Sequence, residues 1–588
     1  MAVLTGTVSV LGSDVCLRLG VTADFPDALP YVQLAAADDA LTAQVTAHLE
    51  SDGNICFTGT REMVFDPARP TELLGETLSL ALRTLEEAWT APNNHDILDE
   101  FASHWSHAQS PRRVLPLLQV YFTPDNQLRE VQAWRKVDRS PRSAQGKRLP
   151  RQPSTSPADQ AIIAVADDPD VARNFDLLST QSLGQPGLTA LYLPLQSSPR
   201  LLPPHPQHPW SAASLRDLVR THLSAADLIE LDRLLEKRPS SRDLILLGIP
   251  RPSGVGIGAR ATVAVRLSGM RGGHALKTTS SMTGVRLELQ SVTRLDRAFI
   301  LQRGGSNDQL GLARVLLLGC GALGGHLALM LAAAGIGHLT LVDHDTFSYD
   351  NSFRHALGRR FVGRRKVEGL AHALRGRYPY VHVIPTHGRT TSLVHQGHLD
   401  LGNFDLIIDA TGSATHHLSL GTVLSARTTH PPALLSWLEV LGLGGHTATV
   451  FQGQPGCPRC LYSDPRAPLW NVAAFSASGQ ALGQDALGCG SYYTPFSDLD
   501  AIRTAEFTAR RAVGILRGDE TKNLLYSWKG NPTAFQAAGH QLSVRFSRVK
   551  QKAFRLGLPY VSASCPICLY VQNEMRRERR PLFVCGNR

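Results

Sequence analysis

The spacing of hydrophobic residues changes its period several times along the chain, and each change marks a different kind of element. Short alternating or continuous apolar runs indicate strands, whereas apolar residues at helical spacing indicate helices. From residue 313 onward the two kinds of segment alternate, which predicts a mostly parallel sheet. Strands are expected at 6–11, 15–21, 31–36, 114–122, 128–137, 162–165, 188–193, 244–249, 261–267, 315–318, 339–342 and 404–409, with 114–122 and 128–137 forming a hairpin, and helices at 71–89, 97–107, 211–237, 323–334 and 507–517.

These patterns divide the chain into four regions. Residues 1–138 combine strands and helices in an α+β arrangement, and residues 159–305 form a mixed α/β region to which the pattern assigns no role. Between them, residues 139–158 are basic and rich in proline and serine, which is typical of a linker. Residues 306–588 carry the βαβ pattern. We therefore expect an α/β protein with a C-terminal Rossmann-like domain.

Composition excludes several other classes of protein. A chain of 588 residues makes about three to five domains, and 43% apolar with 19% charged residues rules out general disorder. No window holds the roughly 20 apolar residues of a membrane span, and the N-terminus lacks the features of a secretory signal. The net charge of +10 comes with few aromatic residues and does not favour a nucleic-acid partner. We expect a cytoplasmic protein.

A glycine-rich turn follows the first strand of the βαβ region. In VLLLGCGALGG, residues Gly319, Gly321 and Gly324 form the pattern G-x-G-x-x-G at the start of a helix. Glycines let the backbone turn tightly and approach a phosphate, and the helix N-terminus offers free N–H groups. This turn predicts a nucleotide site.

The residues after the second strand of this region indicate which nucleotide binds. Asp343 and Asp345 in LVDHD suit ribose hydroxyls, but Asn351, Arg354 and Lys366 follow. A hydride-transfer enzyme does not need positive charge there, whereas an enzyme that handles a triphosphate does, because charge develops on the α-phosphate and on departing pyrophosphate. The cations therefore favour ATP over a nicotinamide cofactor.

These motifs, in this order, resemble the ThiF-type adenylating domain, the fold of ubiquitin-activating enzymes and of the activators of sulfur-carrier proteins. The resemblance covers about residues 309–588 and rests on G-x-G-x-x-G, V-D-x-D, N-x-x-R and G-x-x-K. It implies ATP and Mg²⁺ as cofactors and dimerisation through this domain. It also implies that Gly319, Gly321 and Gly324 hold the phosphates, that Asp343 binds ribose, and that Asn351, Arg354 and Lys366 contact the triphosphate.

The chain departs from the pattern of that family at two positions. Asp409 in IIDATGS stands where the family has D-x-T-D-N, so the second aspartate of the motif is Gly412 here. That aspartate is usually linked to Mg²⁺, and we expect Asp409 or Asp345 to take over its task. The glutamine that usually follows the arginine is His355.

Four cysteines lie in two C-x-x-C pairs, Cys457 with Cys460 and Cys565 with Cys568. Each pair places two thiolates on one tight turn, and two such pairs make a tetrahedral Cys₄ zinc site. The ThiF-type family has the same arrangement. We expect Zn²⁺ to attach the C-terminal segment to the rest of the domain.

A fifth cysteine, Cys489, lies between the two pairs and ahead of a helix. Related enzymes keep a cysteine in this loop, where it takes the activated carrier as a thioester. A thiolate near a helix start has a lowered pKa and attacks an acyl-adenylate. The resemblance therefore makes Cys489 a candidate nucleophile.

The N-terminal region carries a second resemblance, centred on Cys56. FPDALPYVQL followed by GNIC resembles ubiquitin-conjugating enzymes, in which Y-P-x-x-P-P-x-V leads to G-x-I-C, and EFASHW at 100–105 resembles E-F-x-x-Y-W of bacterial members. The H-P-N triplet of that family is absent, so no residue is assigned its oxyanion role. The resemblance implies that Cys56 accepts the carrier as a thioester.

Together, the two resemblances predict successive steps in one enzyme. ATP activates the C-terminus of a carrier protein, Cys489 takes the acyl group, and Cys56 passes it to a target amine, while residues 139–158 supply reach. The whole chain resembles the bacterial activating and conjugating fusion proteins of anti-phage CBASS operons. That resemblance implies a synthase of the cGAS type as the carrier.

Three other functions remain open from the sequence. A sulfur-carrier activator of thiamine or molybdopterin type would not need Cys56. A dimeric scaffold with a degraded adenylating domain would not exchange ATP with pyrophosphate. A nicotinamide oxidoreductase is disfavoured by Arg354 and Lys366.

Overall fold

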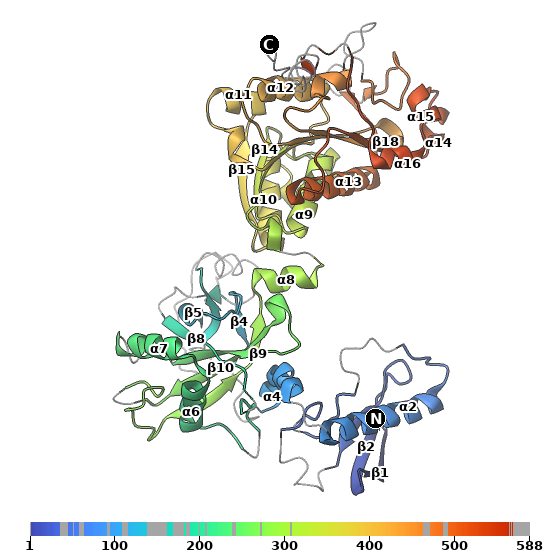
Figure 1. Ribbon diagram of the computed structural model, residues 1–588. Helices are drawn as coiled ribbons and strands as arrows, with labels where there is room; N and C mark the ends of the chain where they lie inside the picture. Colours follow the sequence, from blue (N-terminus) through green and yellow to red (C-terminus); the bar gives the residue numbers. More distant parts are fainter. Residues whose placement is uncertain are drawn as a thin grey trace, which may run out of the picture. The chain divides into compact units, whose positions relative to one another are not determined.

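The computed structural model comprises two compact units, Met1–Gly304 and Gly305–Arg588, and each is described by itself (Figure 1). The structure describes residues 2–35, 45–50, 52–57, 64–90, 94–108, 116–137, 162–168, 182–183, 188–198, 200–205, 208–237, 243–270, 273–305, 308–462, 471–485, 492–563, 565 and 567–568.

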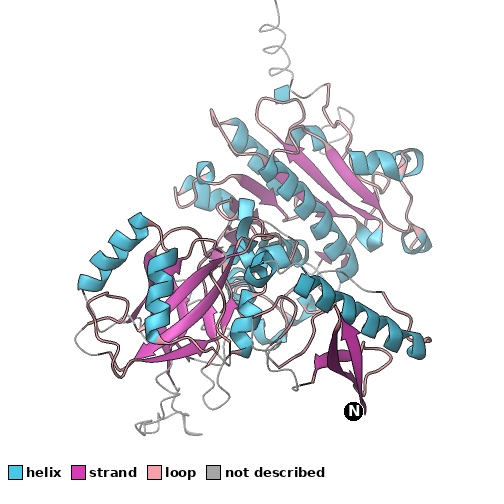
Figure 2. Cartoon of the chain, turned by 60° about the horizontal axis from the view of Figure 1, so that its bottom comes forward, coloured by secondary structure: helices cyan, strands magenta, loops and turns pink. Residues whose placement is uncertain are grey.

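The first unit begins with a small antiparallel sheet covered by one long helix. Strand β2 alternates between buried and exposed residues, and α2 buries Leu73, Thr77, Ala81 and Leu85, which share one helix face. Figure 2 shows α2 lying along this sheet. The sheet has the order β1-β2-β3, with β1 at Ala2–Val10, β2 at Ser13–Val21, β3 at Tyr31–Leu34 and α2 at Pro70–Thr90.

Two short helices after α2 pack elsewhere in the same unit. The helices α3 (Asn94–Asp99) and α4 (Phe101–His107) contribute Leu98, Phe101 and Trp105 to the hydrophobic core of the middle region. The indole N–H of Trp105 also donates to the backbone oxygen of Gln290, at 3.2 Å. The segment that resembles E-F-x-x-Y-W therefore attaches the N-terminal part to the middle region.

The middle region is built on a nine-stranded mixed sheet, counted over the described residues. Its order is β11-β10-β9-β8-β5-β6-β4-β12, and β7 pairs with β5. The strands are β4 Leu118–Val120, β5 Arg129–Val137, β6 Ile162–Ala166, β7 Ser182–Leu183, β8 Leu188–Pro194, β9 Leu244–Pro250, β10 Arg260–Ser268, β11 Arg286–Gln290 and β12 Val292–Arg294.

This sheet differs from the sequence prediction in two ways. The strands β4 and β5 do not form a hairpin, because the fully buried strand β6 lies between them. Both strands belong to the middle sheet, so the boundary expected at residue 138 falls inside it. The expected linker, residues 139–158, consequently joins two neighbouring strands of one sheet rather than two domains.

Helices cover this middle sheet. The helix expected at 211–237 is two helices, because Ser224 caps the second one by accepting the backbone N–H of Asp227, at 3.1 Å. These two helices are α6 Ala212–His222 and α7 Ala225–Lys237, and a further helix, α8 Arg297–Arg303, buries none of its side chains.

The second unit is a doubly wound α/β domain, which confirms the predicted fold class. Over the described residues its seven-stranded sheet has the order β15-β14-β13-β16-β17-β18-β21. The first five strands are parallel, and β18 runs antiparallel to both of its neighbours, β17 and β21. The strands are β13 Arg314–Leu318, β14 His338–Asp343, β15 His382–His387, β16 Leu406–Asp409, β17 Ala433–Leu438, β18 Gly444–Val450, the short pair β19 Gln484–Asp485 and β20 Tyr492–Tyr493, and β21 Leu525–Lys529.

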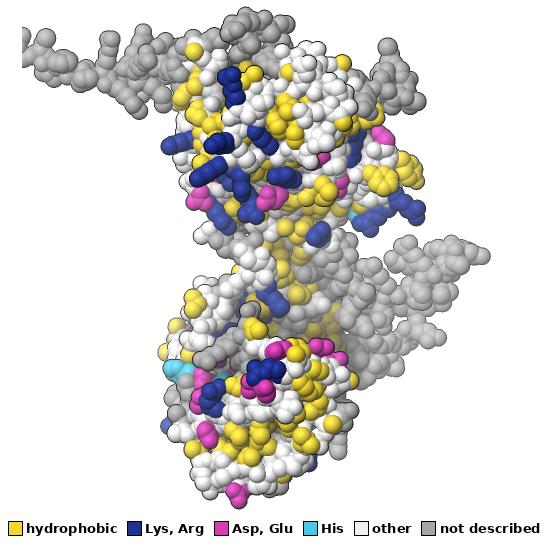
Figure 3. Space-filling view, turned by 90° about the vertical axis from the view of Figure 1, so that its right-hand side faces the viewer, with side chains coloured by type: hydrophobic (Ala, Val, Ile, Leu, Met, Phe, Trp, Pro, Cys, Tyr) yellow, Lys and Arg dark blue, Asp and Glu magenta, His cyan; other side chains and the backbone are white. Residues whose placement is uncertain are grey.

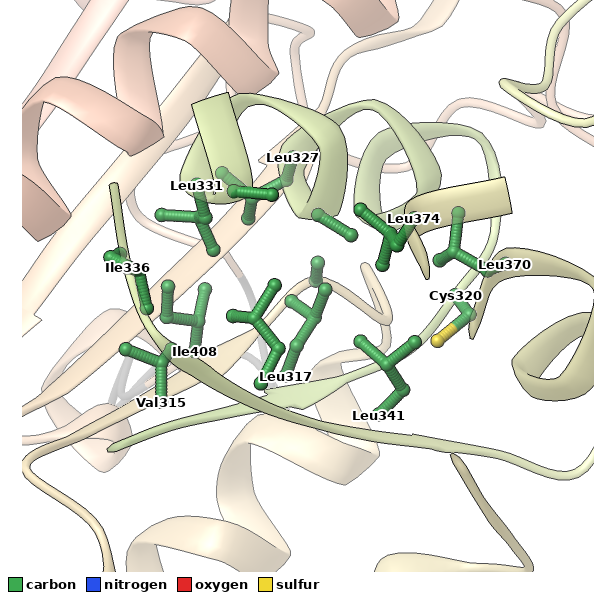
Figure 4. Close-up of a cluster of buried hydrophobic side chains, with 14 of the residues drawn as sticks. Val315, Leu317, Cys320, Leu327, Leu331, Ile336, Leu341, Leu370, Leu374 and Ile408 are labelled. Carbon is green, nitrogen blue, oxygen red and sulfur yellow. The ribbon is translucent and has the colours of Figure 1, made fainter. Parts of the chain in front are cut away.

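Leucine-rich helices pack on both faces of this sheet. Figure 4 shows Leu327 and Leu331 of α9 and Leu374 of α10 above Val315 and Leu317 of β13. Over the described residues, the helices of the second unit are α9 Ala322–Ala333, α10 Lys366–Arg377, α11 Thr390–His395, α12 Ala414–Ser425, α13 Asp498–Arg517, α14 Thr533–Ala537, α15 Val544–Arg548 and α16 Gln551–Leu556. Over the described residues, no helix is long and apolar enough to cross a membrane.

Candidate active site

The glycine loop joins β13 to α9. Two of its glycines are required by close contacts with backbone atoms, and the third faces a cavity. Gly319 has a φ of +88°, and a Cβ there would lie 2.8 Å from the backbone nitrogen of Thr411. A Cβ on Gly324 would lie 1.9 Å from the carbonyl oxygen of Gly319, so only glycine lets the helix approach the strand. Gly321 is unobstructed and lines a cavity. The turn thus presents its backbone and the N-terminus of α9 to a ligand.

That first cavity has a volume of about 450 Å³ and lies at the carboxyl ends of β13, β14 and β16. Asp343 closes one side, where its carboxylate accepts the backbone N–H groups of Cys320 and Asp345, both at 2.7 Å. Each carboxylate oxygen has a second lone pair, so Asp343 can still accept ribose hydroxyls. This geometry suits the sugar of a nucleotide.

Lys366, at the start of α10, lies beside Asp345 in the same cavity. Its Nζ is 2.8 Å from Asp345 Oδ2. Burial opposes the ionisation of Asp345, but the ammonium group outweighs it and lowers the pKa of the carboxyl group. The pair therefore holds Lys366 Nζ at the cavity wall.

A second cavity of about 320 Å³ shares Gly321 and Lys366 with the first. Asn351 and Arg354 line this second cavity, and the Arg354 guanidinium lies 5.3 Å from the centre of the Phe496 ring. The structure therefore divides the predicted triphosphate residues between two adjoining cavities, with Lys366 at the junction. A ligand extending past Lys366 would meet two cations, Lys366 and Arg354, and the amide of Asn351.

His355, which stands where the family has glutamine, makes two hydrogen bonds with its ring. One ring nitrogen, Nδ1, accepts the backbone N–H of Leu357 at 3.0 Å, and Nε2 donates to the backbone oxygen of Cys320 at 2.8 Å. Burial lowers the pKa of His355 to about 4. The neutral ring, with one acceptor and one donor, braces the glycine loop as an amide side chain would.

Asp409 lies beneath the first cavity rather than in its wall. Its carboxylate is fully buried and bonds to the hydroxyl of Thr411 at 2.6 Å and to Nδ1 of His416 at 2.6 Å. Burial would raise the pKa of Asp409, but the neighbouring histidines and Thr411 lower it, and the pKa of His416 is raised by this partner despite its burial. Asp409 therefore acts on the cavity through Thr411 and His416, which both line it.

The sequence analysis missed Arg389 and His416 as cavity residues. Arg389 follows the end of β15, and ligands of α/β sheets bind beyond the carboxyl ends of the strands, so its position was the available signal. His416 gave no such signal, because it is placed by the bond between its ring in α12 and Asp409 at the end of β16.

The four cysteines of the C-x-x-C pairs come together as predicted by their spacing. Neighbouring sulfur atoms are 3.8, 3.6 and 3.4 Å apart, against about 3.8 Å for a tetrahedron with Zn–S bonds of about 2.3 Å. The backbone N–H of Gly456 donates to Cys568 Sγ at 3.3 Å, as suits a thiolate. The donor set therefore fits Zn²⁺.

In the first unit, Cys56 ends a hairpin that extends the small sheet. Leu49 pairs with Ile55, and the backbone N–H of Cys56 donates to the oxygen of His48 at 2.8 Å. His48 and Cys56 are consequently opposite each other in this hairpin, although the backbone of His48 has a left-handed φ of +62°.

Glu100, the residue just before helix α4, holds His48 in this position. Its carboxylate accepts the backbone N–H of His48 at 2.8 Å and lies 2.5 Å from His48 Nδ1. The hydrogen bond to Glu100 raises the pKa of His48. Burial alone would raise the pKa of Glu100, but the bonds from His48 outweigh burial and lower it. Cys489, the other candidate nucleophile, lies outside the described residues.

Two family models match separate parts of the chain. Residues 295–485 match the ThiF family, and residues 2–114 match prokaryotic E2 family B. The chain carries a ThiF domain and a prokaryotic E2 domain. The E2 match ends at residue 114, just before the strands of the middle sheet begin.

The curated relatives match parts of the chain. The ATP-dependent ubiquitin transferase-like protein Cap2 of Pseudomonas aeruginosa is 30% identical over 252 residues, or 42% of this chain and 44% of that protein. The adenylyltransferase and sulfurtransferase MOCS3 of Bos taurus is 34% identical over 211 residues, or 34% of this chain and 44% of that protein. The chain thus spans less than half the length of these relatives.

Among solved structures, E. coli MccB with MccA-N7isoASN aligns to 46% of this chain and 72% of its own chain. The identity is 15% and the TM-score 0.32.

The residues of the ThiF domain fit Mg²⁺ at one of the two expected acids. Asp409 does not fit as a ligand, because its carboxylate is buried and already bonded to Thr411 and His416. Asp345 is half-exposed and lines the first cavity. A magnesium ion between phosphate oxygens and Asp345 is therefore compatible with this site.

Proposed function

We propose that the chain uses ATP to activate the C-terminus of a protein and then transfers it by way of cysteine thioesters. The observation that carries this proposal is the pair of adjoining cavities in the ThiF domain. One offers a ribose acid and a glycine loop, the other offers Asn351 and Arg354, and Lys366 lies in both. This arrangement suits a triphosphate next to an acyl group.

In the first step, a carboxylate oxygen of the substrate attacks the α-phosphorus of ATP. A P–O bond forms, the bond to pyrophosphate breaks, and an acyl-adenylate results. Lys366 and Arg354 stabilise the negative charge that moves onto the leaving pyrophosphate, and Gly321 lets the backbone approach it. A Mg²⁺ ion, held at Asp345, would neutralise further phosphate charge.

In the second step, the thiolate of Cys489 attacks the acyl carbon and AMP leaves. Cys56 then takes the acyl group by transthioesterification, and a target amine attacks the Cys56 thioester to give an amide and a free thiol. The contacts of Cys56 with His48, and of His48 with Glu100, support this role because they fix the backbone that carries the thiol. The resemblance of the chain to activating and conjugating fusion proteins of CBASS operons favours an anti-phage setting with a cGAS-like substrate, and we propose a homodimer formed through the ThiF domain.

The proposal is tested by ATP–pyrophosphate exchange and by thioester trapping with a candidate substrate protein. We expect a reducible adduct that needs Cys489, and a second adduct that needs both Cys489 and Cys56. The variants Cys489→Ala and Cys56→Ala are compared on non-reducing gels, with Cys16→Ala as the matched cysteine control. Exchange without any adduct would contradict the transfer through cysteine thioesters. No exchange at all would contradict the activation by ATP.

A second candidate function is supported by the bovine relative, an adenylyltransferase and sulfurtransferase. Under that function a hydrosulfide-level sulfur donor attacks the acyl carbon of the adenylate, AMP leaves, and a thiocarboxylate results. Cys56→Ala would then leave product formation unchanged, and mass spectrometry would find sulfur in place of one oxygen at the C-terminus of the substrate.

A further inference from the structure

A stretch near the C-terminus carries positive charge without any acid. Residues 521–573 contain seven lysines and arginines and neither aspartate nor glutamate. Four of these side chains, Arg548, Lys550, Lys552 and Arg555, are exposed on and between α15 and α16, and together they define the basic surface. Figure 3 shows lysine and arginine side chains gathered on the face of the C-terminal unit that these helices occupy.

The basic surface is not needed for packing. Its helices are fixed from below by the buried rings of Phe546 and Phe554. Two other cations of the stretch lie against these rings, Lys529 at 4.7 Å from Phe546 and Arg545 at 4.9 Å from Phe554.

Within the described residues, the four cations of the basic surface have no acidic partner. Lys550 caps α16 and Lys552 lies in its first turn, where positive charge opposes the helix dipole. Unpaired charges of one sign, placed where they do not help folding, indicate a surface that meets a partner of the opposite sign.

A line of contacts leads from this surface to the second cavity. Phe546 and Phe554 share a hydrophobic cluster with the turn at Val440–Gly442. In that turn, the backbone N–H of Leu441 donates to the oxygen of Pro495 at 2.7 Å. Pro495 adjoins Phe496, which lines the cavity with Arg354.

We propose that the basic surface docks an acidic, aliphatic-containing segment of the protein whose C-terminus is activated. This inference rests on the proposed function and adds the recognition chemistry of its substrate. A polypeptide fits better than a nucleic acid because Val544 and Leu556, 64% and 68% exposed, flank the cations. The aromatic rings that could stack on bases, Phe546 and Phe554, are buried.

The test is direct binding of a short, fluorescein-labelled peptide of Glu-Glu-Leu triplets to the full chain, measured by anisotropy. We expect the triple variant R548E/K552E/R555E to weaken binding by at least about tenfold, and the neutral variant R548Q/K552Q/R555Q to weaken it less. Raising NaCl from about 50 to about 300 mM should weaken binding to the unmodified chain.

The matched control is R314E/R377E/R517E, which makes the same change in charge on exposed arginines near the amino ends of the strands. This control should bind the peptide as the unmodified chain does. Equal loss in the control, no loss in the test variant, or tighter binding of a DNA duplex than of the peptide would overturn the proposal.

ATP binding by calorimetry separates this inference from the proposed function. The variant R548E/K552E/R555E should bind ATP normally, because none of the three residues lines either cavity. A chain that binds the peptide but not ATP would refute the proposed function and leave the docking surface standing.

Discussion

Single residues carry the departures of this ThiF domain from its family, and His355 shows how such a departure is accommodated. Its neutral ring makes one hydrogen bond as acceptor and one as donor between two segments around the glycine loop. The identity of this residue could be read from the sequence. Its role could not, because the bond to Cys320 joins residues 35 positions apart.

We predict that His355→Gln retains ATP binding and that His355→Leu weakens it. Glutamine reproduces one acceptor and one donor, whereas leucine leaves the Leu357 N–H and the Cys320 oxygen without partners, at about 1–3 kcal/mol for each buried group. Thermal melts and ATP calorimetry of the two variants check this prediction. Equal stability of both variants would mean that the two hydrogen bonds of the His355 ring do not stabilise the glycine loop.

The glycines of the loop make a second prediction at this scale. Gly324→Ala should abolish ATP binding and lower the melting temperature, because its Cβ would lie 1.9 Å from a backbone oxygen. Gly321→Ala should fold normally and weaken ATP binding only, since nothing obstructs its Cβ. Calorimetry with both variants gives the comparison, and normal ATP binding by Gly324→Ala would contradict it.

The ion pair of His48 with Glu100 predicts a pH dependence. Glu100 has a lowered pKa, so its contribution to stability is lost as pH falls through that value, and His48 has a raised pKa, so its contribution is lost as pH rises through that value. Glu100→Gln should therefore destabilise the first unit most between about pH 5 and pH 7.

The checking measurement is the difference in melting temperature between the unmodified chain and Glu100→Gln over pH 4 to about pH 9. Glu86→Gln, at an exposed position of α2, is the control and should show no such window. A difference that stays constant with pH would contradict the ion pair. Alkylation rates of Cys56 in the same samples report whether its surroundings change.

Elements differ in how well the sequence predicted them. The strands and helices around the nucleotide were found because each is a continuous run with one period, such as β13 at Arg314–Leu318. The pairing of β4 with β6 and β12 was not found, because no local signal indicates which strands of a mixed sheet are neighbours. The helix break at Ser224 was missed because one polar cap interrupts an otherwise periodic stretch.

The cysteine turns are elements whose spacing did predict their meeting, and they yield a metal prediction. The purified chain should contain about one zinc per molecule, and Cys565→Ala should lose it and lower the melting temperature by at least about 5 °C. Cys16→Ala, outside the cluster, should keep the metal. Elemental analysis decides, and a full zinc content in Cys565→Ala would refute the site.

At the scale of the whole molecule, the linker has a different position from the one its composition indicated. Proline- and serine-rich sequence at residues 139–158 is typical of a tether between domains. The flanking strands β5 and β6 are antiparallel neighbours, with Arg135 paired to Ile162. Its composition could be read from the sequence, but the pairing of its ends depends on the fold.

We therefore predict that shortening 139–158 to a brief Gly-Ser segment leaves the rate of Cys489-to-Cys56 transfer within about twofold, because a tether raises effective concentration only when it joins the two sites. Single-turnover transfer, followed on non-reducing gels, measures this rate. A tenfold loss would show that the segment supplies reach after all.

The strand pairing on either side of that segment has one more consequence. A protease that cuts the backbone once between Val137 and Ile162 would break the chain without dividing the molecule, since β5 and β6 remain hydrogen-bonded in the same sheet. The gene could accordingly be split there into two reading frames, and the two polypeptides, made together, should assemble into one working enzyme.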